Sequence, residues 1–321
     1  MRLSTALDTR LPLVRPARRP WTVTTPARDV ALVVNANASG AERPGDVAER
    51  AASALRAAGA RVAVSLTADA AELGAIVDTT DDRTLVLVGG DGTVHAYANL
   101  ARPDLPPAAL LPAGRANNIA RALGIPVDWR NAARLAVRGR PTAVDALHVV
   151  TPDRALYAVE GVSAGFHAAA RHRYDGPNSA DLAAGVRALA AELRAYNPHR
   201  IALRTDDAAA SFTGAAAQVF LSNLPYFGFG FRVDPVADPA DGRLEAIVLE
   251  GATRRDVVRM LAAARGGRHL GRTGVTWHST TTARLDAPVP LVADAQQLGV
   301  TTATVSVAPG RLALVAPEAG R

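Results

Sequence analysis

The sequence predicts an α/β protein with a parallel sheet in its N-terminal half, a mainly antiparallel β-rich C-terminal half, and a cleft between the two. Up to about residue 145, short apolar runs alternate with helical patterns, which is typical of a parallel sheet covered on both faces. Beyond that point, strand-like segments follow one another with two helices between them. The 321 residues suffice for two domains, because single domains commonly hold roughly 100 to 200 residues.

The first half contains four short apolar runs, which predict strands at 30–34, 61–66, 84–88 and 108–111. Helical spacing predicts helices at 48–59, at 69–78 and from 94 to about 100. Loops follow three of the strands, at 35–40, 89–93 and 112–118. A parallel sheet would bring these loops to one edge, at the carboxyl ends of the strands where ligands bind in such sheets.

The second half alternates apolar and polar residues over many short segments. They predict strands at 146–150, 155–166, 199–205, 215–224, 243–250, 280–286, 302–308 and 311–316. Two helical patterns, at 180–196 and 254–265, interrupt them. The predicted divisions of the chain are therefore an extension at 1–28 and domains at 29–145 and 146–317.

The chain contains no cysteine and no lysine, so all 36 basic residues are arginines and carry the net charge of +6. Thiolate sites and disulfides are excluded, as is a phosphate loop that depends on lysine. Arginine remains available for phosphates, because its guanidinium donates hydrogen bonds in a planar fork. Aromatic residues make up only 4% and the arginines are spread out, so we predict no nucleic-acid partner.

Residues 1–28 are rich in arginine and proline and lack the apolar core of a secretory signal. We expect them to form a disordered basic extension. No apolar run reaches the roughly 18 to 20 residues that a membrane span requires. Together these observations predict a cytoplasmic protein.

A glycine-rich turn, GGDGT, follows the third predicted strand. Gly89, Gly90 and Gly92 allow the backbone to turn sharply and to approach a ligand, and the helix that follows offers unpaired amides. Asp91 and Thr93 add a carboxylate and a hydroxyl. The pattern indicates a phosphate site without lysine, although a tight turn alone would give the same residues.

Several segments in order resemble the diacylglycerol kinase catalytic-domain family, which includes bacterial lipid kinases and, more distantly, sphingosine and ceramide kinases. They are VVNANASG at 33–40, Thr67, GGDGT at 89–93, PAGRANNIARALGIP at 112–126, Asp145, GVSAGF at 161–166, the stretch 223–230 and ADPADGRLEAIVL at 237–249. The resemblance implies transfer of the γ-phosphoryl group of ATP to a hydroxyl of a lipid or lipid-like molecule. The domain at 29–145 would bind nucleotide and the domain at 146–317 the acceptor.

The resemblance also assigns roles to individual residues. It implies a nucleotide site, with Mg²⁺ accompanying ATP, at Asn35, Thr67, Gly89, Gly90, Asp91, Gly92, Thr93, Gly114, Arg115 and Asn117. It implies a second, structural Mg²⁺ position at Asp241, with oxygens around Asp238 and Arg243. An ordinary Asp-Gly turn between strands accounts for that last segment equally well.

Three departures from the family pattern fall in the same inferred site. The family's Asp-Gly-Glu motif reads Asp294, Ala295 and Gln296 here, and a glutamine cannot act as a general base. The predicted catalytic residues are therefore Asp294, as a substitute base, with Gln296 and Asp91.

The other two departures lie in the phosphate segments. Arg115 replaces a threonine or serine and Asn118 an aspartate, and Arg115 would bind a phosphate, occupy the nucleotide site or pair with Asp91. His95 and Ala96 replace an asparagine-glutamate pair, and we expect His95 to be a partly exposed helix residue without an orienting partner.

Three functions remain open from the sequence: an active lipid kinase, a catalytically silent relative that binds nucleotide or lipid, and a different chemistry in the same cleft. A NAD kinase shares GGDGT but fits the later segments less well, and NANASG is not the GxGxxG of a dehydrogenase. The aromatic stretch 223–233, NLPYFGFGFRV, predicts an apolar acceptor site or a membrane contact, or else a cap on the core. A homodimer also remains open.

Overall fold

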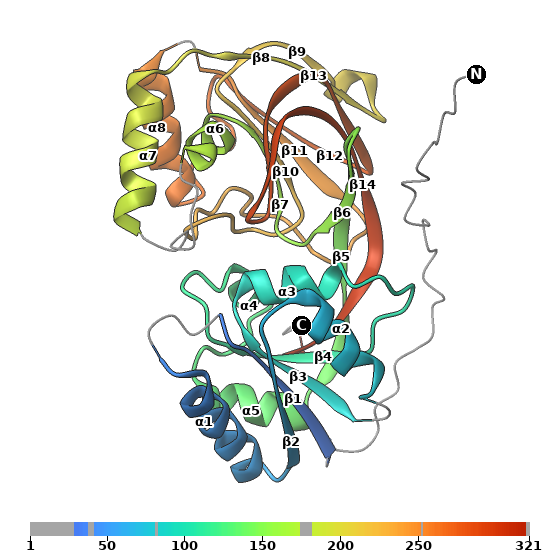
Figure 1. Cartoon of the computed structure of the whole chain (residues 1–321). Coiled ribbons are helices and arrows are strands. Elements are labelled where there is room, and N and C mark those ends of the chain that lie inside the picture. Colours follow the sequence, from blue (N-terminus) through green and yellow to red (C-terminus); the bar gives the residue numbers. More distant parts are fainter. Residues whose placement is uncertain (1–28, 38–41, 81–82, 174–181, 252, 319–321) are drawn as a thin grey trace, which may run out of the picture.

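The computed structural model describes residues 29–37, 42–80, 83–173, 182–251 and 253–318 (Figure 1). The predicted extension at 1–28 lies outside the described residues. The first half contains β1 (Asp29–Asn35), α1 (Pro44–Ala57), β2 (Arg61–Thr67), α2 (Ala70–Asp78), β3 (Thr84–Gly89), α3 (Asp91–Ala98), β4 (Ala108–Pro112), α4 (Asn118–Ala122) and α5 (Trp129–Arg138).

The strands of the first half form a parallel sheet in the order β2-β1-β3-β4, as the sequence predicted. Apolar side chains of α1 and α5 pack on one face of this sheet. Those of α2, α3 and α4 pack on the other face. Because both faces are covered, β3 reads as a continuous aliphatic run rather than as an alternating pattern.

The second half contains β5 (Arg140–Val150), β6 (Ala155–Ala158), β7 (Gly161–Gly165), α6 (Phe166–His172), α7 (Leu182–Arg194), β8 (His199–Thr205), a short 3-10 helix (Ala208–Ala210), β9 (Phe212–Ala216), β10 (Gln218–Ser222), β11 (Leu244–Leu249), α8 (Arg254–Arg265), β12 (Val275–Thr280), β13 (Thr282–Ala293) and β14 (Gln296–Ala316). Its strands pair antiparallel along the path β12-β11-β10-β7-β13-β14, which confirms the predicted fold class. In Figure 1, α6, α7 and α8 gather on one side of these strands.

The long strand β14 joins the two halves, since it pairs with β13, with β5 and with β4. The sequence predicted two strands here, at 302–308 and 311–316. The register with β5 shifts between Ala308 and Leu312, and Gly310 has a φ of +61°. A bulge at this glycine bends one continuous strand, where the sequence pattern suggested a break.

Five elements were not predicted: α4, α5, α6, the 3-10 helix and β12. In addition, α3 begins at Asp91 rather than at 94, so the last three residues of GGDGT form its first turn. The amides of Thr93 and Val94 donate to the carbonyl of Gly90, which starts the helix inside the glycine turn. This arrangement directs the N-terminus of α3 to the carboxyl edge of the sheet.

Candidate functional site

Two glycine loops meet at the carboxyl edge of the parallel sheet. A Cβ on Gly90 would lie 2.8 Å from the Cα of Gly114, and one on Gly114 would lie 2.6 Å from the Cα of Gly90. Asn117, with a φ of 47°, holds the second loop: its Oδ1 accepts from the Gly114 amide at 2.9 Å and its Nδ2 donates to the Gly114 carbonyl at 2.7 Å. We call these two loops, 89–93 and 112–117, the phosphate cradle.

Side chains from neighbouring strands support the cradle. The Thr93 side chain covers Gly89, because a Cβ there would lie 2.0 Å from Thr93 Oγ1. Asn35 Nδ2 donates to that hydroxyl at 3.1 Å, and the amide of Ala36 donates to the carbonyl of buried Thr67. The structure therefore brings together loops that the predicted parallel sheet placed at one edge, and adds Thr67, which the sequence had connected to them only by resemblance.

The cradle suits the phosphates of ATP. A Cβ on Gly92 would meet nothing within 4 Å, so there is open space above the first turn of α3. The N-terminus of a helix favours anions, because its first amides lack intrahelical partners and its dipole is positive there. Arg115 is exposed and, in the part of the chain that the structure describes, forms no ion pair with Asp91. Its contact with a phosphate stays a prediction.

The polar face of α3 lies against the second half of the chain. Asp91, His95 and Asn99 are four residues apart, so they share one face of the helix. Asp91 accepts from the Ile119 amide at 2.9 Å, and burial raises the pKa of its carboxyl. Asn99 binds both the amide and the carbonyl of Tyr157, in β6.

His95 occupies the middle of this face, with Nδ1 2.7 Å from Oδ2 of Asp294. Its side chain is 14% exposed and that of Asp294 only 4%. His95 is thus a partly exposed helix residue, as predicted, but it does have an orienting partner. The sequence could not show this contact, because the two residues are 199 positions apart.

A buried carboxyl that the sequence analysis missed lies beside Asp91 and Asp294. Glu160 accepts from Asn118 Nδ2 at 2.9 Å, and the same amide donates to the carbonyl of Gly228 at 2.7 Å. Burial first, and then the charges of Asp91 and Asp294, raise the pKa of Glu160 well above its ordinary range. Glu160 immediately precedes the GVSAGF segment, but its burial depends on residues distant in sequence.

The remaining predicted residues lie at two separate places. Gln296 is exposed at the start of β14, facing Ala293 across the turn. Asp238 and Asp241 lie in the loop before β11, where each side chain accepts from a backbone amide two residues on. The Arg243 guanidinium donates to Ser279 and so points toward β12.

The chemistry of the Asp238 and Asp241 loop suits a divalent cation only in part. Asp145 lies close to it, and its pKa is raised first by burial and then by the charges of Asp241 and Asp238. Both oxygens of Asp145 already accept backbone amides, from Gly242 and Gly310. Among the described residues, no group of three or more histidine, aspartate or glutamate side chains is arranged to hold a metal ion. The Mg²⁺ position thus stays a prediction.

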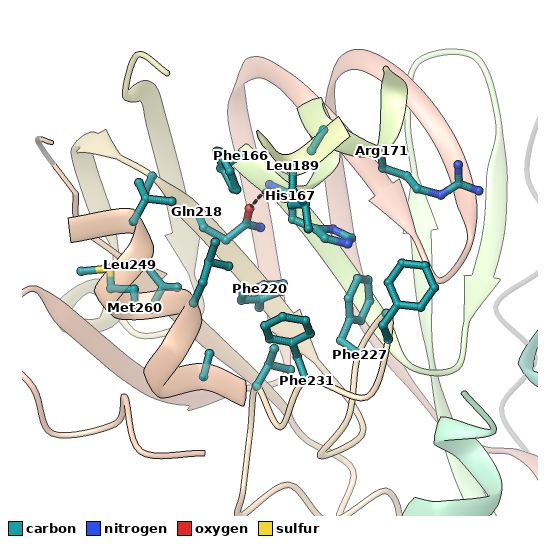
Figure 2. Close-up of a pocket in the computed structure, with 18 of the residues that line it drawn as sticks. Phe166, His167, Arg171, Leu189, Gln218, Phe220, Phe227, Phe231, Leu249 and Met260 are labelled. Carbon is teal, nitrogen blue, oxygen red and sulfur yellow. Dashed lines mark hydrogen bonds between the residues drawn. The ribbon is translucent and has the colours of Figure 1, made fainter. Parts of the chain in front are cut away.

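An apolar pocket lies in the second half, between α6, α7, α8 and the strands (Figure 2). Figure 2 shows the rings of Phe220, Phe227 and Phe231 grouped below His167, with Leu249 and Met260 at the other side. Three rings of the aromatic stretch, those of Phe227, Phe229 and Phe231, line the pocket. The fourth ring, that of Tyr226, lies beneath the Arg121 guanidinium.

Polar groups in the pocket are fixed by hydrogen bonds. His167 Nδ1 lies 2.9 Å from the Ser163 hydroxyl, and its amide donates to Gln218 Oε1. Burial, and to a lesser degree the charge of Arg171, lowers the pKa of His167 to about 4. The ring of His167 is therefore uncharged at neutral pH, and the lining of the pocket is mainly apolar, with Arg171 as a charged side chain in it.

Family models match both halves of the chain. The diacylglycerol kinase catalytic domain matches residues 29–149, and the YegS C-terminal NAD kinase beta sandwich-like domain matches residues 160–316. A probable lipid kinase YegS-like from Chromohalobacter salexigens is 27% identical over 278 residues, 82% of this chain and 86% of the relative. A diacylglycerol kinase from Mycobacterium tuberculosis is 27% identical over 262 residues, 77% of this chain and 80% of the relative.

Solved structures show the same fold. A diacylglycerol kinase from Bacillus anthracis superposes with a TM-score of 0.66 at 16% identity, covering 91% of this chain and 97% of that one. The two family-model matches and the lipid kinase relatives place the chain in the class of lipid kinase-like proteins. Within it, the chain belongs to the diacylglycerol kinase family. No helix in the described ranges is both long and apolar enough to cross a membrane.

Proposed function

We propose that this protein transfers the γ-phosphoryl group of ATP to a hydroxyl of a lipid of the diacylglycerol type. One observation carries the proposal: the phosphate cradle and the apolar pocket meet at Asn118. This residue follows the cradle directly, and its amide donates both to Glu160 and to the carbonyl of Gly228, which lines the pocket. A lipid with its chains in the pocket and its hydroxyl toward Asn118 would approach the end of a nucleotide bound in the cradle.

The proposed roles follow this arrangement. The cradle residues, with Asn35 and Thr67, position the phosphates of ATP, whose Mg²⁺ neutralises charge during transfer. Asp91, Asp294 and Gln296 lie at the reacting end. The lipid oxygen forms a bond to the γ-phosphorus while the bond from that phosphorus to the bridging oxygen breaks, and ADP leaves. We also propose that the chain divides at about residue 145 into nucleotide and acceptor domains.

A second candidate, a catalytically silent relative, is favoured by one observation. Gln296 stands where the family pattern has glutamate, and loss of a general base typically removes about 10²- to 10⁴-fold in rate. The pocket and the cradle would then serve binding alone. Contact with a membrane surface, which the exposed Phe229 at the pocket would assist, is compatible with both candidates.

One assay distinguishes the active lipid kinase from the catalytically silent relative. The purified protein is incubated with γ-labelled ATP, Mg²⁺ and dioctanoylglycerol in detergent micelles, and the lipid products are separated by thin-layer chromatography. We expect labelled phospholipid that depends on the added lipid and disappears in Asp91→Asn. Nucleotide binding without any labelled lipid would favour the silent relative and contradict the proposal.

A further inference from the structure

Two of the departures from the family pattern come together around one carboxylate. His95, on α3, and Gln296, at the start of β14, are 201 positions apart in the sequence, yet their side chains hydrogen-bond each other, and His95 also contacts Asp294. Compared with the family pattern, this chain lacks a carboxylate at position 296 and has an imidazole at position 95. Their contact suggests that the second change compensates for the first.

Asp294 is held in place by four donors. Oδ1 accepts from the amides of Glu160 and Gly161, at 2.8 and 3.1 Å. Oδ2 accepts from the Val159 amide at 2.8 Å and lies 2.7 Å from His95 Nδ1. Its φ of 50° lies in the left-handed region, which a non-glycine residue adopts only under local constraint. A carboxylate so occupied is suited to fixing the imidazole rather than to receiving a proton from a substrate.

The contact with Asp294 determines which nitrogen of His95 is basic. A carboxylate accepts from Nδ1–H, so the lone pair of the neutral ring lies on Nε2. The nearest amide, Asn99 Nδ2, lies 3.5 Å from Nε2, but it donates at 2.9 Å to the His95 carbonyl and at 2.8 Å to that of Tyr157. Both of its hydrogens are thereby used, so Asn99 does not occupy the Nε2 lone pair. The remaining partner of the ring is Gln296, whose hydrogen bond raises the pKa of His95 and so stabilises a proton on the ring.

We propose that His95 Nε2 accepts the proton of the acceptor hydroxyl, and that Asp294 is the positioning residue that orients the imidazole. As the lipid oxygen bonds to the γ-phosphorus, its proton moves to Nε2, the ring becomes an imidazolium paired with Asp294, and the leaving electron pair stays on ADP. The role rests on the proposed function. His95 is one helical turn, about 5.4 Å along the axis, from Asp91 at the cradle, so it is near the phosphates.

The surroundings of His95 suit this role. Burial lowers the pKa of the ring, but the hydrogen bond and the charge of Asp294, with a hydrogen bond to Gln296, more than offset it, so the pKa of His95 lies above its ordinary value. The other titratable groups that face this region are Asp91, on the same helix, and Glu160, before β7. A base whose pKa is near the working pH is the most effective.

Glu160 is the competing candidate and is less suited. Its carboxyl accepts from Asn118 and is fully buried, and its pKa is raised well above the ordinary range. Burial favours the neutral form of its carboxyl, and a neutral carboxyl is a poorer proton acceptor than a carboxylate. It serves instead to connect the pocket to the cradle through Asn118.

Phosphoryl transfer to dioctanoylglycerol is measured across pH for the wild type, His95→Gln and the control His278→Gln, which removes a partly exposed histidine on β12. We expect His95→Gln to lower kcat by about 100-fold or more, with the Kd for ATP unchanged. The wild-type kcat/KM should rise with pH as His95 loses its proton, and this limb should vanish in His95→Gln. His278→Gln should behave as the wild type.

Full activity of a folded His95→Gln protein, within about threefold of wild type, would overturn the role. A second readout does not need turnover: nitrogen-15 NMR of the histidines, with His95→Gln assigning the signal. It should show a neutral ring protonated at Nδ1, and protonation at Nε2 would contradict the inference. Wild-type protein that binds ATP but labels no lipid would instead contradict the proposed function itself.

Discussion

The phosphate cradle and the apolar pocket are built in opposite ways. The cradle is made of backbone, since Gly90 and Gly114 touch through their Cα atoms and no side chain could stand between them. The pocket is made of side chains, contributed by α6, α7, α8, β10 and the loop before β11. A backbone site depends on a few local residues, whereas a side-chain site depends on packing between elements that are distant in sequence.

This difference explains why the two regions should respond differently to mutation. In the cradle, a single methyl group meets backbone that cannot yield, while the rest of the core is untouched. In the pocket, each aromatic ring is at once part of the core and part of the binding surface, unless it is exposed. Stability and binding are therefore separable in the cradle where a new side chain would meet no protein atom, as at Gly92, and coupled in the pocket at its buried rings.

The largest expected effect is in the pocket, where Phe227 is 3% exposed and packs on Phe220. Phe227→Ala should lower the free energy of unfolding by about 3–5 kcal/mol, because it leaves a cavity in the core. Phe229 is 38% exposed, so Phe229→Ala should lower the free energy of unfolding by less than about 1 kcal/mol. It should nevertheless raise KM for the lipid. Urea denaturation and the transfer assay measure both. Equal stability losses in the two variants would contradict the assignment of Phe227 to the core and of Phe229 to the binding surface.

Acid should weaken the pocket through His167. Its folded pKa of about 4 lies below the ordinary 6.5, so between these values the unfolded chain takes up a proton that the folded protein does not. The stabilisation that comes from the neutral His167 ring is fully present above pH 6.5, and up to about 3 kcal/mol of it is lost as the pH drops to 4. Glu245 acts in the opposite sense, because its pKa is raised by burial to about 7 and its stabilisation is lost as pH rises through 4.5 to 7.

His167→Asn isolates the first of these effects, because it leaves Glu245 in place. The difference in unfolding free energy between mutant and wild type should change between pH 6.5 and 4 and stay constant above pH 7. Denaturation curves at several pH values measure it. A constant difference throughout this range would show that His167 is not buried as a neutral ring.

In the cradle, Gly90→Ala should destabilise the protein by about 1–3 kcal/mol, because its Cβ would lie 2.8 Å from the Cα of Gly114. It should also weaken ATP binding by tenfold or more, since the loops must separate. Gly45→Ala is the matched control, because a Cβ there, in the first turn of α1, meets nothing within 4 Å. It should leave binding unchanged. A Gly90→Ala protein with wild-type stability would mean that the loops do not meet.

The smallest effect concerns the predicted Mg²⁺ position. Mg²⁺ at ten times its Kd should stabilise the wild type by about 1.4 kcal/mol. Thermal unfolding without nucleotide should show a smaller gain in Asp241→Asn than in the wild type. Equal increases in thermal stability in the two proteins would show that the loop at Asp241 is an ordinary Asp-Gly turn and not a Mg²⁺ position.

Much of the fold could be predicted because it depends on local patterns. Three of the four parallel strands, β1, β3 and β4, contain aliphatic runs of four or more residues, and α8 was predicted with its observed bounds. In contrast, β12 is a half-exposed strand with mixed polarity, and α5 has an alanine- and arginine-rich sequence with few large apolar residues. For α6, only the φ of +104° at Gly165 separates the helix from the strand before it.

The site was predictable only where its residues are adjacent in sequence. GGDGT and the loop that ends at Asn117 carry their geometry in glycines and a left-handed asparagine. The roles of Glu160 and His95 depend on partners far along the chain, so nothing in their local sequence reveals them. The exposed Gln296 was noted as a loss, but its neighbour on α3 became visible only in the structure.

The most direct test of the account is calorimetric titration of the protein with ATP and Mg²⁺, in the wild type and in Gly92→Ala. A Cβ at Gly92 clashes with no protein atom within 4 Å but occupies the space assigned to the phosphates. The account predicts binding that ADP competes for in the wild type, and its loss in a Gly92→Ala protein of unchanged stability. Equal binding by both proteins, or no binding by the wild type, would contradict the placement of nucleotide in the cradle.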